Sequence, residues 1–108
     1  MRIFPPEALQ HFSESVRLDP EFANGHLSLG IELSRLGREP EAADAFATAL
    51  KLDPRLIDAR LRLGVSLARQ RKLADARAQF EQVLQAQPNN PTAQRYLQSI
   101  VNSAQASP

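Results

Sequence analysis

Residues 23–56 read ANGHLSLGIELSRLGREPEAADAFATALKLDPRL, and residues 57–90 read IDARLRLGVSLARQRKLADARAQFEQVLQAQPNN. The blocks are both 34 residues long and align without a gap. The positions that recur are apolar, glycine or proline: Leu29, Gly30, Leu33, Ala42, Phe46, Leu50 and Pro54 return as Leu63, Gly64, Leu67, Ala76, Phe80, Leu84 and Pro88. A fixed period of this length indicates stacked supersecondary units that bury their apolar faces against one another.

The flanking segments continue the pattern in part. Residues 7–20 match the second half of a block, with Ala8, Phe12 and Val16 in the places of Ala42, Phe46 and Leu50. We therefore divide one domain, residues 1–108, into a half repeat (7–20), two repeats (23–56 and 57–90) and a C-terminal capping helix (91–104). Because the half repeat lacks its first helix, we expect the chain to be a piece of a longer protein.

The recurring residues resemble the tetratricopeptide repeat family, whose period of 34 residues carries Leu-Gly, Ala, Phe and Pro at fixed offsets. The chain departs from the family pattern at a few positions. His26 and Arg60 stand where Trp is usual, Leu33 and Leu67 where Tyr is usual, and Val83 replaces an Ala. The resemblance implies an all-α fold, in which antiparallel helix pairs stack as a short right-handed superhelix.

Apolar residues at helical spacing predict six helices. We expect them over residues 7–18, 21–36, 41–52, 55–70, 74–86 and 92–104, an antiparallel helix-pair solenoid. Gly30 and Gly64 fall inside helices, where glycine is unfavourable, so we expect each to make room for the paired helix. Gly37 can end a helix with positive φ. Arg71 occupies the equivalent position and should be less comfortable there.

Composition excludes several function classes. The formal net charge of the 108 residues is +1, which does not favour a nucleic-acid or membrane binder. No apolar run approaches the roughly 20 residues of a membrane helix. The chain has no cysteine and only two histidines, His11 and His26, at no metal-binding spacing. We predict a cytoplasmic protein that is not an enzyme and uses no cofactor or metal.

The resemblance implies a concave groove, lined by the first helix of each repeat, that holds partner peptides. Helical spacing places one stripe of each such helix opposite the core. The predicted partner-binding residues are Asn24, Leu27, Ser28, Ile31, Arg35, Asp58, Leu61, Arg62, Val65, Arg69 and Arg95, and the last helix adds Thr92 and Ser99.

Two features of this stripe favour a binding site. It carries four aliphatic residues (Leu27, Ile31, Leu61 and Val65), and apolar patches rimmed by polar groups often mark interaction sites. Arginines also gather there, since residues 57–72 hold five basic residues against Asp58 alone. Two alternatives remain open: the aliphatic side chains are covered by the curl of the superhelix, or the charges form a merely solvated face.

The leading hypothesis is a non-enzymatic protein-interaction scaffold that binds a short apolar and acidic partner segment in the groove. The alternative is self-association, as a homodimer, through an exposed N-terminal helix carrying Leu9, Phe12 and Val16. Part of the family binds chaperone tails through a clamp of Lys and Asn residues. Leu27 and Ser28 stand where such a clamp wants a basic residue and Asn, which argues against that specificity.

Overall fold

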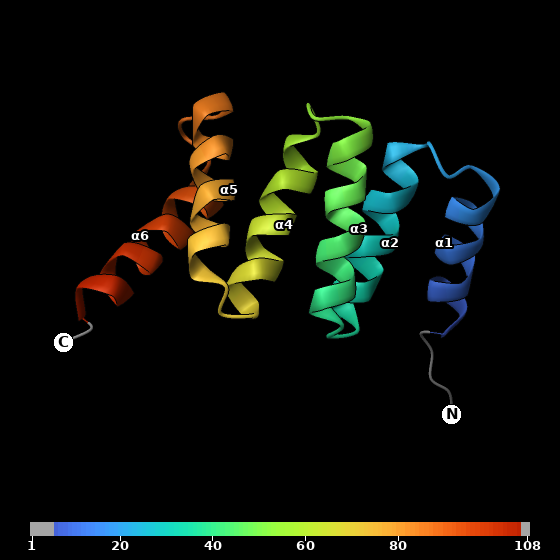
Figure 1. The fold of residues 1–108 in the computed structure, drawn as a ribbon, viewed down its shortest axis with the longest axis horizontal. Helices are drawn as coiled ribbons and strands as arrows, with labels where there is room; N and C mark the ends of the chain where they lie inside the picture. The colour runs from blue at the N-terminus through green and yellow to red at the C-terminus, as the bar shows by residue number, and fades with distance from the viewer. Residues whose placement is uncertain (1–5, 107–108) are drawn as a thin grey trace.

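The computed structural model describes residues 6–106, and the side chains of residues 7–104. Within this range the chain forms six helices and no strand, so the predicted all-α class is confirmed (Figure 1). The helices are α1 (Pro6–Leu18), α2 (Ala23–Arg35), α3 (Glu39–Leu52), α4 (Ile57–Arg69), α5 (Leu73–Ala86) and α6 (Pro91–Ala106). They stack side by side along an elongated molecule of 46 × 34 × 19 Å.

The predicted starts of three helices were wrong by two residues. The helices α2 and α4 begin at Ala23 and Ile57 rather than at 21 and 55. Before each helix, a tight turn is closed by a backbone hydrogen bond, from Phe22 to the Asp19 carbonyl (3.2 Å) and from Leu56 to the Asp53 carbonyl (3.1 Å). The helix α3 instead begins early, at Glu39, because proline is tolerated within the first helical turn.

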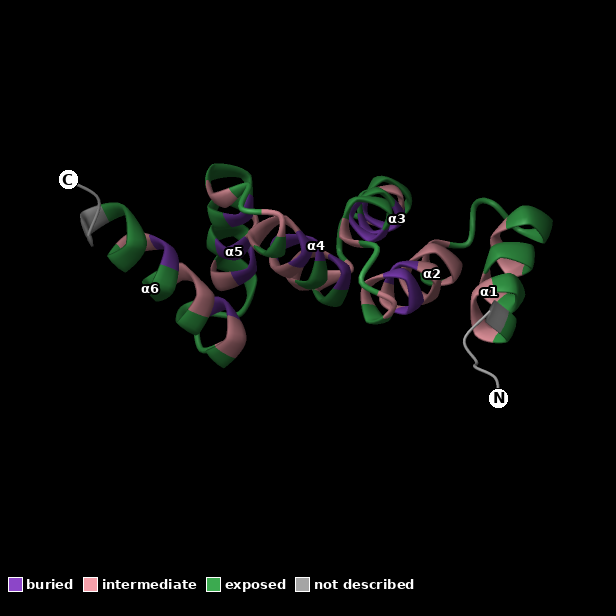
Figure 2. Ribbon diagram, turned by 90° about the horizontal axis from the view of Figure 1, so that it is seen from below, coloured by how far each residue is buried: buried purple, intermediate pink, exposed green. Residues whose placement is uncertain are grey.

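The core of each helix pair is a phenylalanine packed on a glycine. A Cβ added to Gly30 would lie 2.5 Å from the Phe46 ring, and one added to Gly64 would lie 2.8 Å from the Phe80 ring. Both rings are fully buried, on α3 and α5 respectively. The recurring glycines therefore exist to let the paired helix approach, as the sequence predicted. Figure 2 shows the buried residues running along the inner faces of the stacked helices.

The turns between paired helices differ at one position. Gly37 has φ of 80°, and its equivalent Arg71 has φ of 65°. Arg71 is the one residue other than glycine with positive φ in the part of the chain that the structure describes. Left-handed backbone disfavours a residue with a Cβ, so the turn at Arg71 is strained, as expected from the sequence.

Candidate functional site

A hollow of about 220 Å³ lies between α2, α4 and α6. We call it the α4 hollow, because α4 supplies most of its lining. The lining residues are Ser34, Phe46, Asp58, Leu61, Arg62, Val65, Arg69 and Thr92. Pockets for small molecules usually measure about 300–1,000 Å³. The α4 hollow is smaller, so it suits one inserted side chain rather than a whole small molecule.

The helix α4 places its residues on two sides. Ala59 and Leu63 are buried in the core, whereas Leu61 and Val65 are half-buried and line the α4 hollow. These two side chains also pack against the buried cluster around Phe80. They are thus held in place from beneath and partly open from above, which is the geometry of the floor of a binding site.

The predicted stripe on α2 behaves differently. Leu27 and Ile31 are half-buried and pack against the core cluster around Phe46. None of the predicted residues of α2 (Asn24, Leu27, Ser28, Ile31 and Arg35) lines the α4 hollow. Arg95, on α6, is exposed and also lies outside it. The hollow therefore brings together the α4 half of the predicted stripe, with Thr92 from α6.

Three of the predicted arginines pair with acids of the same chain. Arg62 lies 3.1 Å from Asp58, one helical turn away, and both side chains are about half exposed. Arg35 pairs with Glu32, a carboxylate buried in α2, and this hydrogen bond raises the pKa of Arg35. Arg69 lies 3.1 Å from Glu39. Two arginines line the α4 hollow. Arg62 pairs with an exposed acid on its own helix, whereas Arg69 pairs with the largely buried Glu39 of α3.

Glu39 is the centre of a polar cluster that ties three helices together. Its carboxylate accepts hydrogen bonds from Ser34 on α2 (3.1 Å), from Ser66 on α4 (2.9 Å) and from Arg69 on α4 (3.1 Å). The Glu39 side chain is 15% exposed, and Ser66 is 1% exposed. Arg69 also donates to the Ser34 hydroxyl (3.1 Å). We call these four residues the Glu39 cluster.

Sequence reasoning missed the Glu39 cluster. Its members lie up to 35 residues apart, and their contact depends on how α2, α3 and α4 cross. One signal was present in the sequence: Ser66 interrupts the apolar side of α4 at a buried position. A buried hydroxyl requires a hydrogen-bond partner, and Glu39 at the start of α3 supplies it.

The basic charge of residues 57–72 is only partly directed at the α4 hollow. Arg60 reaches toward α5 and donates a hydrogen bond of 3.0 Å to Gln79. Arg62 and Arg69 line the hollow, but Arg69 is committed to Glu39. The α4 hollow therefore has one arginine, Arg62, that can exchange its acidic partner, rather than a broad basic surface.

The predicted self-association residues are partly covered. Leu9 packs against the core cluster around Phe46, and Phe12 and Val16 are half-buried. The most exposed large apolar side chains at this end are instead Leu18 and Phe22, which are 69% and 54% exposed. They flank the turn between α1 and α2, and the sequence reading did not single them out.

Two features of the described residues bear on the function classes. Across residues 6–106 no helix combines the length and apolarity needed to cross a bilayer. The same residues contain no group of three or more histidine, cysteine or acidic side chains arranged to hold a metal ion.

Several solved structures are similar to the chain. The first TPR of Spaghetti (RPAP3), bound to the HSP90 peptide SRMEEVD, is 26% identical with a TM-score of 0.88, covering 95% of this chain and 81% of that one. The MamA RS-1 ArsTM double mutant is 27% identical with a TM-score of 0.88, covering 94% of this chain and 57% of that one. The Arabidopsis OM64 TPR domain, at 20% identity and a TM-score of 0.86, covers 92% and 82% and shares the fold.

The comparison with curated proteins found no match. The sequence profile of the tetratricopeptide repeat matches residues 4–57 and again residues 27–91, which together cover most of the chain. With the recurring glycine and phenylalanine positions and the stacked helix pairs, this match shows that the chain belongs to the tetratricopeptide repeat family.

Proposed function

We propose that the chain is a non-enzymatic protein-interaction scaffold that binds a short apolar and acidic segment of a partner protein. The observation that carries the proposal is the α4 hollow, with half-buried Leu61 and Val65 as its floor and Arg62 at its side. An aliphatic side chain of the partner fills the hollow, and an acidic side chain pairs with Arg62.

The ion pair between Arg62 and Asp58 is compatible with this role. Exposed ion pairs contribute only about 0–1 kcal/mol, because water competes with them. A partner carboxylate can therefore share or replace Asp58 at little cost. Arg69 is unsuited to the same task, since Glu39, Ser34 and their hydrogen bonds hold its guanidinium.

The similar first TPR of Spaghetti supports a peptide ligand of this chemistry. That protein is bound to the peptide SRMEEVD, which contains both apolar and acidic residues. Our proposal concerns the chemical class only, because Leu27 and Ser28 stand where a chaperone-tail clamp would need basic and amide side chains. The cytoplasmic location remains a prediction from the sequence.

The test compares two matched charge reversals. Arg62 and Arg77 both pair with an acid one helical turn away, and their side chains are 44% and 52% exposed, but only Arg62 lines the α4 hollow. Protein partners are captured with wild type, Arg62→Glu and Arg77→Glu and quantified by mass spectrometry. We expect Arg62→Glu to lose partners that Arg77→Glu retains. Equal retention by both variants would contradict the proposal.

Self-association is a second candidate, and exposed Leu18 and Phe22 favour it. Two apolar side chains beside one turn give a small surface that a second copy can cover in a two-fold dimer. Sedimentation of wild type and Phe22→Ser over a hundredfold concentration range tests this candidate. A dimer that Phe22→Ser weakens supports it, and a concentration-independent monomer excludes it.

A further inference from the structure

The two repeats are built differently at one set of equivalent positions. Adding 34 to each residue number carries the Glu39 cluster onto the next junction, between α4, α5 and α6. Ser34, Glu39, Ser66 and Arg69 become Ala68, Leu73, Ile100 and Ser103. The carboxylate, its arginine and both of its hydroxyl donors are therefore all replaced, and nothing in this junction repeats the polar cluster of the first.

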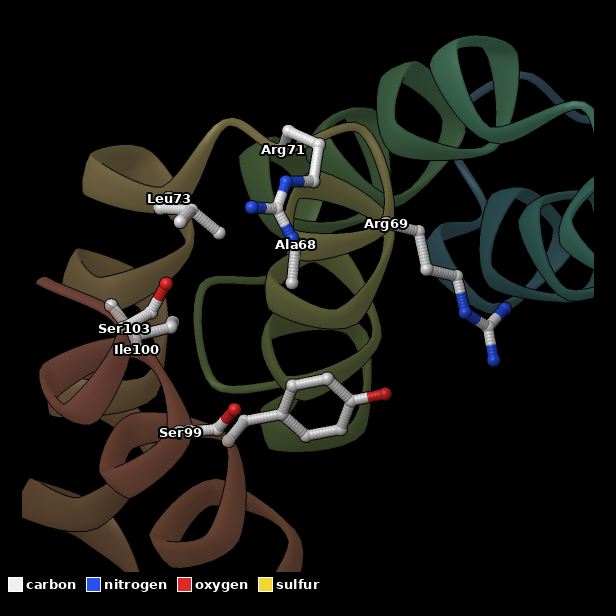
Figure 3. A pocket seen from close by; sticks show the side chains of 8 residues that line it. Ala68, Arg69, Arg71, Leu73, Ser99, Ile100 and Ser103 are labelled. Atoms are coloured by element: carbon white, nitrogen blue, oxygen red, sulfur yellow. The ribbon is translucent and has the colours of Figure 1, made fainter. Parts of the chain in front are cut away.

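The replaced junction leaves a hollow of about 200 Å³, which we call the α6 hollow (Figure 3). Its lining residues are Ala68, Arg69, Arg71, Leu73, Tyr96, Ser99, Ile100 and Ser103. Ala68, Leu73 and buried Ile100 give it an apolar floor. The Tyr96 ring stacks on the Phe80 ring, with 5.1 Å between the ring centroids, and forms a rigid wall of the hollow.

The α6 hollow has a polar rim with one arginine turned toward it. Hydroxyl groups of Ser99 and Ser103 lie on the α6 side, and Arg71 lies across from them. Figure 3 shows the Arg69 side chain pointing away from the hollow, where it reaches Glu39. Arg71 makes no ion pair with any described side chain. The rim thus carries a positive charge that no described side chain neutralises.

We infer that the α6 hollow is a second anchor site, which takes one aliphatic side chain of the partner segment and pairs an adjacent acidic side chain with Arg71. This inference rests on the proposed function, which it extends by one repeat. In the first junction Glu39, the equivalent of Leu73, occupies part of the equivalent space. Beside it, the α4 hollow is lined by Ser34, Arg62, Val65 and Arg69, the equivalents of Ala68, Tyr96, Ser99 and Ser103. In the second junction the partner supplies both the apolar group and the carboxylate.

The volume of the α6 hollow and the polarity of its lining favour this occupant. The hollow is below the roughly 300 Å³ at which small-molecule pockets begin, but it has room for one side chain. Its floor is apolar, so a buried charged group there would be left without a partner. A carboxylate is therefore accommodated at the rim, where Arg71 and the serine hydroxyls donate hydrogen bonds.

The test selects binders from a random library of displayed 12-residue peptides with wild type, Arg62→Glu, Arg71→Gly and Leu73→Glu. Glycine suits the positive φ of residue 71, so Arg71→Gly removes the charge without harming the turn. Leu73→Glu places a carboxylate in the hollow, as Glu39 does in the first junction. Thermal melts confirm that each variant is folded.

We expect wild type to select peptides with an aliphatic residue beside an acidic one. Arg71→Gly should keep the aliphatic preference and lose the acidic one. Replacing that acidic residue by its amide should weaken binding about fivefold for wild type, the size of an exposed ion pair, and not for Arg71→Gly. Leu73→Glu should lose at least tenfold in affinity, since a buried aliphatic contact is lost.

The outcomes separate the two proposals. If wild type selects peptides and Arg62→Glu changes them, but Arg71→Gly and Leu73→Glu select the same sequences as wild type, the second anchor is wrong and the α4 hollow stands. If wild type selects no peptide, both proposals are wrong.

Discussion

The junction of α2, α3 and α4 and the junction of α4, α5 and α6 are equivalent by repeat position but opposite in chemistry. The first contains the Glu39 cluster, in which a carboxylate of the chain accepts hydrogen bonds from two serines and an arginine of the chain. The second is an open hollow with an apolar floor, and its Arg71 forms no ion pair with any side chain that the structure describes. The helix pairs on either side are alike, since the same glycine and phenylalanine meet in both.

This difference separates what stabilises the fold from what varies between repeats. Positions that set the distance within a helix pair, Gly30 with Phe46 and Gly64 with Phe80, are repeated without change. Positions at the junctions change completely over one period. The Glu39 cluster therefore contributes stability, whereas the equivalent positions of the second junction present surface that a partner can use.

Removing the centre of the first junction should have the largest effect on stability. Glu39→Ala leaves Arg69 and the buried Ser66 hydroxyl without their acceptor, which should lower the free energy of unfolding by about 2 kcal/mol. Urea unfolding of Glu39→Ala and of Leu73→Ala, its equivalent, measures the difference. Equal decreases in the free energy of unfolding for the two variants would show that the hydrogen bonds of the Glu39 cluster contribute nothing beyond packing.

The two helix pairs should respond alike, in contrast to the junctions. Gly30→Ala and Gly64→Ala force a Cβ against a buried ring, so each should destabilise by about 1–2 kcal/mol despite the better helix propensity of alanine. Gly30→Ala should be the worse, since its Cβ is closer to the ring (2.5 Å against 2.8 Å). Gly25→Ala is the control: its Cβ meets ordinary contacts, and the variant should be as stable as wild type or up to about 1 kcal/mol more stable.

The sequence predicted the features that depend on repetition. The period identified the helix order, the packing role of Gly30 and Gly64, and the unusual turn at Arg71, because each follows from comparing one repeat with the next. The spacing of α4 also predicted the α4 residues that line the α4 hollow, because the stripe opposite Leu63 follows directly from helical geometry, whereas Ser34 and Phe46 were not predicted.

The remaining features depend on how the helices cross and could not be predicted. The contact of Ser34 with Glu39 and Arg69 joins three helices, and no local pattern encodes it. The pairing of Arg35 and Arg69 with chain acids was likewise invisible, since an arginine on a predicted surface looks available. The helix starts differed because the turns after Pro20 and Pro54 extend two residues further than the prolines alone indicate.

Substitutions at the two equivalent turn positions, Gly37 and Arg71, should change the stability of the fold in opposite directions. Arg71→Gly relieves a side chain from left-handed backbone and should stabilise the fold by about 1 kcal/mol. Gly37→Ala places a side chain in the same conformation and should destabilise by a similar amount. Differential scanning calorimetry measures both. A less stable Arg71→Gly protein would mean that the Arg71 side chain makes stabilising contacts in the free chain.

The smallest effect concerns pH. Arg38 donates to Glu41 at 2.7 Å and holds the pKa of Glu41 below its ordinary value of 4.5. A lowered folded pKa gives stability that is present above the unfolded pKa and is lost as the pH falls through the folded pKa. Glu41→Gln should thus be slightly less stable than wild type at pH 7, and the difference should vanish in acid. Among the ion pairs of the described residues none joins the equivalents Lys72 and Asp75, so Asp75→Asn is the control that removes a carboxylate without removing an ion pair.

The most direct test of the contrast between the junctions is an NMR titration of the isotopically labelled protein with a peptide selected by the wild type. The account predicts that the largest shifts fall on Leu61, Val65, Arg71, Leu73 and Ser99, whereas Glu39 and Ser66, which line neither hollow, and the outer surface of α5 change little. Shifts centred on Glu39 and Ser66, with none at Leu61, Val65, Leu73 or Ser99, would show that neither hollow receives the partner and would contradict the account.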